Sequence, residues 1–128
     1  MRQVAQLIAP IILSLAVSWL GPPAYANDVT ARALAAQLET DAAARPAAAL
    51  ADLSRIDAAL PGASAPVQRE VLLRLRQLHR DVGDYRSAAA VNARLRSLGK
   101  QYHDRLALVQ AALGDLDDQI RAYNFAAA

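Results

Sequence analysis

Apolar side chains recur at steps of three and four residues along most of the chain beyond residue 27, which is the period of one face of an α-helix. The pattern is clearest over residues 67–82, where large apolar residues follow at steps of four, three and four. Residues 28–43 carry a weaker stripe, with Glu39 and Asp41 on the outward side. The pattern predicts six helices: 28–43, 46–60, 67–82, 85–98, 101–113 and 116–125.

Short turns separate the predicted helices. Two of them are Gly83-Asp84 and Gly114-Asp115. In each pair the glycine tolerates the left-handed conformation at the end of one helix, and the aspartate can cap the start of the next. Gly99 is expected to end the fourth helix. Turns this short connect antiparallel neighbours, so the six helices are predicted to form three hairpins.

The hairpins also resemble one another in sequence. Residues 82–85 (VGDY) align with residues 113–116 (LGDL) at an offset of 31. A period of 30 to 40 residues built from one helical hairpin is typical of an α-solenoid. The predicted fold class is therefore all-α, a short α-solenoid of about three antiparallel hairpins, and an up-and-down helical bundle is the alternative.

The composition agrees with helices. Alanine occurs 31 times in 128 residues and aromatic residues make up only 5%, whereas strands favour β-branched and aromatic residues. The chain has no cysteine, which excludes disulfides, thiolate zinc sites and cysteine nucleophiles.

The first 26 residues have the order of a secretory signal peptide. Arg2 supplies a positive charge, residues 4–20 are almost wholly apolar, and residues 21–26 (GPPAYA) end in Ala-x-Ala. We predict cleavage after Ala26, which leaves residues 27–128 in the bacterial periplasm or outside the cell. The alternative is an uncleaved anchor, and the chain would contact a membrane only through this segment.

In one hairpin, residues 83–85 (GDY) are followed by Ala88 and preceded by His79. Residues 83–85 and Ala88 match the centre of the tetratricopeptide-repeat motif, and His79 lies where that family prefers Tyr, so this hairpin resembles the family. Arg76 departs from the pattern at a position that is usually small, and Asn92 departs at one that is usually aromatic.

The resemblance extends over essentially all of residues 27–128 and implies a concave groove lined by the first helix of each pair. Arg74 and Arg80 would be placed to grip a carboxylate there with two hydrogen bonds each. An ordinary solvated helix face is the alternative. The groove residues that the resemblance implies are Glu70, Arg74, Gln77, Arg80, Gln101, Asp104 and Arg105.

The sequence gives no pattern for catalysis, a cofactor or a metal. His79 and His103 lie on different predicted helices, and no HExxH, GxSxG or glycine-rich phosphate loop occurs. Removal of residues 1–26 would remove Arg2 alone, leaving 13 basic against 12 acidic residues with no concentrated basic face. Nucleic-acid binding is therefore not expected.

The predicted function is that of an exported, non-catalytic helical-repeat module that binds a protein or peptide partner through its groove. In the alternative, the chain resembles the periplasmic sensory segment, whole or truncated, of a bacterial signalling receptor such as a diguanylate cyclase. The last predicted helix has an apolar face that should either self-associate or be covered by further residues. That face is formed by Leu116, Ile120, Tyr123 and Phe125.

Overall fold

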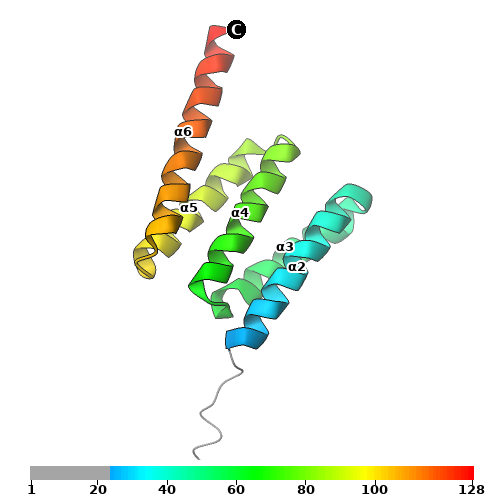
Figure 1. The fold of residues 1–128 in the computed structure, drawn as a ribbon. Coiled ribbons are helices and arrows are strands. Elements are labelled where there is room, and N and C mark those ends of the chain that lie inside the picture. Colours follow the sequence, from blue (N-terminus) through cyan, green and yellow to red (C-terminus); the bar gives the residue numbers. More distant parts are fainter. Residues whose placement is uncertain (1–23) are drawn as a thin grey trace, which may run out of the picture.

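The computed structural model describes residues 24–128, and these residues form helices without any strand, so the all-α prediction is confirmed (Figure 1). The predicted signal peptide lies outside the described residues except for 24–26, which begin the first described helix. The elements are α2 (Ala24–Ala44), α3 (Pro46–Ala59), the 3-10 turn η1 (Leu60–Gly62), α4 (Ala65–Asp81), α5 (Tyr85–Gln101) and α6 (Arg105–Ala127).

The two helices of each hairpin pack against each other, α2 on α3 and α4 on α5. The hairpin α2–α3 stands beside the hairpin α4–α5, with α2 against α4, and α6 packs on α5 (Figure 1). Side-chain hydrogen bonds then join α2 to α4, α3 to α5 and α4 to α6. They are Arg32–Glu70, Arg94–Asp57 and Arg76–Gln110, between residues 38, 37 and 34 positions apart.

The core follows part of the predicted stripes in the first two hairpins, whereas Leu50 and Val82 on the same stripes are exposed. Leu38 of α2, Ile56 of α3, Val71 of α4 and Leu95 of α5 are among the largest fully buried side chains. At these positions the three-and-four spacing correctly identifies the buried face of each helix.

The turn predicted at Gly114-Asp115 is not formed, because α6 runs unbroken from Arg105 to Ala127. Gly114 is buried, and a Cβ atom there would lie 2.6 Å from Arg76 Nη1 and closer still to Asn92 Oδ1. The glycine therefore leaves room for two side chains from α4 and α5. The predicted helices 101–113 and 116–125 are largely one helix, and residues 24–128 form two hairpins and a single long helix in place of three hairpins.

Gly99 does not end a helix either. α5 continues to Gln101, and a Cβ on Gly99 would lie 2.6 Å from Leu108 Cγ and 3.0 Å from Leu108 N. Since Leu108 N belongs to the backbone of α6, this glycine allows the two helices to approach closely.

The turn that does end α5 is formed by residues 102–104, and it matches the turn after α4. His103 has a φ of 52° and Gly83 a φ of 78°, so each supplies the left-handed residue of its turn. The aspartate that follows each one caps the next helix: Asp84 Oδ1 accepts from Ser87 N at 3.0 Å, and Asp104 Oδ1 accepts from Ala107 N at 3.1 Å. The sequence resemblance between residues 82–85 and 113–116 therefore does not mark structurally equivalent turns.

Candidate functional site

Two of the seven predicted groove residues lie between α4 and α2. Glu70 Oε2 is 2.9 Å from Arg32 Nη2, and Arg74 Nε is 3.8 Å from Glu39 Oε1. Both pairs are exposed to solvent, where such ion pairs contribute little free energy. They connect neighbouring helices, and Arg74 is already beside a carboxylate of its own chain.

Arg80 lies on the other side of α4, against α6. Its guanidinium is 3.1 Å from Asp117 Oδ2 and 3.0 Å from Asp118 Oδ1, and its side chain is only 12% exposed. It also donates to the Gly114 carbonyl at 3.3 Å. Because α6 supplies these acceptors, Arg80 holds α6 in place and does not face a free groove.

The other four residues are dispersed. Gln77 donates to Asp81 within α4 at 2.7 Å, and Arg105 is exposed at the start of α6. Asp104 caps α6 and accepts a hydrogen bond from Arg69 of α4. Burial raises the pKa of Asp104, but the bonds from Ala107 N–H and Arg69 lower that pKa more, so it lies below its ordinary value. Gln101 lines a pocket whose lining includes none of the other six residues, so the predicted set does not form one site.

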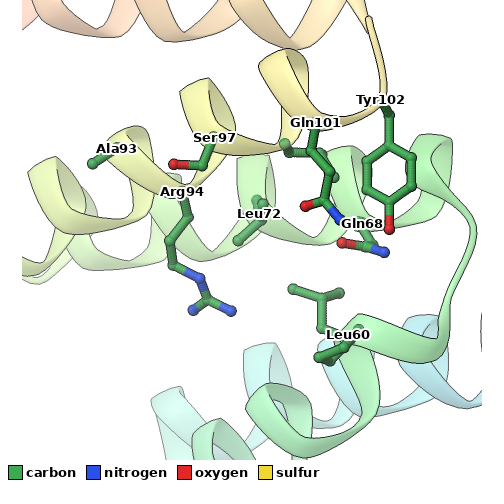
Figure 2. A pocket seen from close by; sticks show the side chains of 10 residues that line it. Leu60, Gln68, Leu72, Ala93, Arg94, Ser97, Gln101 and Tyr102 are labelled. Carbon is green, nitrogen blue, oxygen red and sulfur yellow. The ribbon is translucent and has the colours of Figure 1, made fainter.

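That pocket has a volume of about 430 Å³ and lies between η1, α4 and α5 (Figure 2). Side chains from α4 and α5 point toward Leu60, which borders the opposite side. Leucines from all three elements form its apolar part, and amides, hydroxyls and one guanidinium form the polar part. The lining residues are Leu60, Pro61, Gln68, Leu72, Ala93, Arg94, Ser97, Leu98, Gln101 and Tyr102.

Local structure explains how these residues meet. Pro61 and Gly62 convert the end of α3 into the 3-10 turn, which brings buried Leu60 against the start of α4. Gln68 and Leu72 lie one turn apart on α4, and Ala93, Ser97 and Gln101 repeat at the same spacing on α5.

Two polar side chains of the pocket have fixed partners. Gln68 is buried and its Nε2 donates to the Ala63 carbonyl at 2.8 Å, so the orientation of its amide is set. Arg94 Nη1 donates to Asp57 Oδ1 of α3 at 2.8 Å in an exposed ion pair. Sequence reasoning missed both residues, because their spacing is that of any amphipathic helix and only the packing of α3 and η1 distinguishes this face.

A pair of buried carboxyl groups lies elsewhere, between α2 and α3. Asp41, which the sequence placed outside, is buried and accepts from Gln37 at 3.0 Å and from Arg45 at 2.5 Å. These bonds lower its pKa. Burial, and then the adjacent Asp41 carboxylate, raise the pKa of Asp52, whose Oδ2 has no hydrogen-bond partner among the described residues. Neither carboxyl borders the pocket, so we assign the pair to the core of the first hairpin.

The histidines do not form a metal site. His79 Nδ1 is 3.6 Å from Asp84 Oδ2, and His103 is exposed in its turn. Within residues 24–128 no three His, Asp or Glu side chains are grouped so that they would hold a metal ion. The same residues include no helix with the length and apolar character that a membrane span requires.

Comparison of the chain with models of known protein families, with curated proteins and with solved structures finds no match.

Proposed function

We propose that this chain is an exported, non-catalytic helical-repeat module that binds a peptide segment of a partner protein in the pocket between η1, α4 and α5. The observation that carries the proposal is the pocket itself, with its apolar part and its polar border on three packed elements. Its volume of about 430 Å³ falls within the range that proteins use for ligands.

The polar border suits a peptide. Gln68 and Gln101 carry amides, and Ser97 carries a hydroxyl; both groups can donate and accept, as the N–H and C=O groups of a peptide backbone require. Arg94 donates Nη1 to Asp57, and its remaining guanidinium N–H groups are donors for a carboxylate of the peptide. The leucines that border the same space would take an apolar side chain of the peptide.

The lining also supports binding over catalysis. The ten residues around the pocket include no His, Asp, Glu or Cys, the side chains that most often transfer protons or attack substrates near neutral pH. Packed helices present the pocket in a preformed state, so little conformational entropy is lost when a peptide docks.

Membership of a tetratricopeptide-like repeat family is part of the proposal. It is supported by residues 83–85 with Ala88, and by hydrogen bonds that join helices two elements apart at separations of 34 to 38 residues. Export to the periplasm or beyond is supported by the pattern of residues 1–26. Mass spectrometry of the chain recovered from an exporting bacterium tests this part, since an N-terminus other than Asn27 contradicts cleavage after Ala26.

The pocket is tested with a displayed library of random peptides of about 12 residues, which covers extended and helical binders. Ala93 is exposed and lines the pocket, so Ala93→Trp should fill it without disturbing the core. Ala90 is exposed one turn earlier on α5 and does not line the pocket, so Ala90→Trp is the matched control. We expect peptides that bind the native chain and Ala90→Trp equally, and Ala93→Trp at least about tenfold more weakly.

Two results contradict the proposal. One is a library that yields no peptide above background. The other is a set of peptides whose affinity for Ala93→Trp equals that for the native chain, because their site is then elsewhere on the molecule.

A further inference from the structure

The helix α6 exposes a row of large apolar side chains. Its exposed large residues include Leu106, Val109, Leu113, Leu116, Ile120 and Tyr123, each between 51% and 74% exposed. Leu106, Val109 and Leu113 have the spacing of a buried helix face, but all three are exposed. The side of α6 that packs on its own chain carries Ala107, Ala111 and Gly114.

The spacing of this row matches a helix–helix seam. Its six residues follow at steps of three, four, three, four and three, which averages close to 3.5 residues per turn. A row with the straight-helix period of 3.6 would drift around the helix, whereas a period of 3.5 keeps the row facing a second, supercoiled helix. The row therefore has the geometry of a surface that one long helix would cover.

We propose that the α6 helix of a second copy of this chain covers the row, running antiparallel to the first. The step pattern reads the same in both directions, so a reversed second copy meets it side chain for side chain. Leu113 then lies opposite Leu116 of the second copy, Val109 opposite Ile120, and Leu106 opposite Tyr123. This is an isologous contact with its two-fold axis between residues 114 and 115.

The sides of the row favour the same arrangement. The positions that flank a heptad seam on α6 carry mostly Gln, Ala and Asn, and the charged ones are Arg105 and Asp117. In the antiparallel pairing neither of these meets a like charge, and small flanking residues such as Ala112 let the helices approach.

The shape of α6 distinguishes the antiparallel from the parallel pairing. Its C-terminal part extends beyond the ends of α4 and α5 (Figure 1). In an antiparallel pair, each projecting end lies along the start of the other copy's α6, near that copy's body. In a parallel pair the projecting ends would meet only each other, and less apolar surface would be covered.

The exposed area is sufficient for a dimer of moderate affinity. Six large side chains that are each half exposed or more present about 600 Å² on each copy, taking roughly 100 Å² for each. The total of about 1,200 Å² reaches the lower limit of stable, specific interfaces. This surface is distinct from the peptide pocket, so the two proposals can fail separately.

Sedimentation equilibrium of the purified chain between about 1 µM and 1 mM tests the pairing. We expect a monomer–dimer equilibrium. Leu113→Glu and Leu116→Lys should each weaken the dimer by at least about tenfold, because each places a charge in the seam. The side chains are exposed in the monomer, so folding should survive, and circular dichroism checks this. Leu50→Glu, a leucine that is 69% exposed on α3, is the control and should leave the dimer unchanged.

The double variant Leu113→Glu/Leu116→Lys fixes the direction. In the antiparallel pair each Glu faces a Lys, so the double variant should dimerise more tightly than either single variant. In a parallel pair Glu faces Glu and Lys faces Lys, so the double variant should be weaker than both. A double variant weaker than both single variants overturns the antiparallel pairing. A native chain that remains monomeric, or a dimer indifferent to Leu113→Glu, overturns the proposal and assigns the face to another partner.

Discussion

Whether Gly114→Ala stabilises or destabilises the chain depends on how α6 packs. In the middle of an exposed helix, Gly→Ala stabilises a protein by about 1 kcal/mol, since alanine has the higher helix propensity. Gly114 is helical but buried, and a Cβ at this position would lie 2.6 Å from Arg76 Nη1. We therefore expect Gly114→Ala to destabilise the chain.

The magnitude follows from the contacts around the glycine. Arg76 Nη1 donates to Asn92 Oδ1 at 2.7 Å and to the Gln110 carbonyl at 2.8 Å. Displacement of the guanidinium would lose a charged hydrogen bond, about 1.5–3 kcal/mol, and overpacking adds about 1–3 kcal/mol. After the gain in helix propensity of about 1 kcal/mol, the free energy of unfolding should fall by about 1.5–5 kcal/mol. For a chain of this size, at about 5 °C for each kcal/mol, the melting temperature should then fall by roughly 8 to 25 °C.

Urea and thermal unfolding followed by circular dichroism measure the effect. Ala90→Gly, an exposed change in α5, calibrates helix propensity and should cost about 1 kcal/mol. Combination of Gly114→Ala with Arg76→Ala should reduce the cost of the alanine without abolishing it, because the guanidinium is absent but the closer contact with Asn92 Oδ1 remains. A Gly114→Ala chain as stable as the native one, or more stable, would refute the reasoning.

Three further predictions concern single positions. His103→Gly should stabilise the chain by up to about 1 kcal/mol, because His103 adopts a positive φ that glycine adopts without strain. Gly83→Ala should destabilise the chain by a similar amount for the same reason, and urea unfolding measures both effects. Burial and a neighbouring carboxylate raise the pKa of Asp52 above 3.8, so the native state loses stability as the pH rises past that value. Asp52→Asn should therefore stabilise the chain at pH 7 and not at pH 3, and unchanged pH dependence would contradict this. Asp104→Ala should lower the free energy of unfolding by more than about 1 kcal/mol at pH 7. The loss should shrink as the pH falls, because the native Asp104, whose pKa lies below 3.8, becomes protonated. Asp84→Ala removes a more exposed cap and should lower the free energy of unfolding by about 1 kcal/mol.

The sequence predicted the second hairpin well because two local signals coincide there. The apolar stripe of residues 67–82 becomes α4 (Ala65–Asp81), and Gly83-Asp84 forms the turn that the sequence indicated. Periodicity locates a helix, and a left-handed residue followed by a capping aspartate locates its end.

The same signals failed around α6. Gly99 and Gly114 suit a turn in sequence, but both lie inside helices where another chain segment approaches closely. Conversely, the turn at residues 102–104 uses His103 as its left-handed residue. The sequence alone cannot separate a glycine needed for its φ from one needed for its small size, because that difference lies in the neighbouring helix.

The candidate site was predictable only in part for a similar reason. Gln101 was expected in a groove and does line the pocket, whereas Arg80 was expected there and instead binds α6. Helical spacing shows that residues share a face. Which neighbour covers that face depends on contacts between segments about 34 to 38 residues apart.

The two departures from the tetratricopeptide pattern also belong together. Arg76 and Asn92 hydrogen-bond to each other, and Asn92 Nδ2 donates to the Ala111 carbonyl and to Asp115 Oδ1 of α6. Asn92 is buried, so a rotation of α6 that broke these bonds would leave its amide unsatisfied in the interior. Gly114 provides the space that the network requires. The network therefore holds the small-residue side of α6 inward, and with α6 held in this orientation the row of large apolar residues faces solvent.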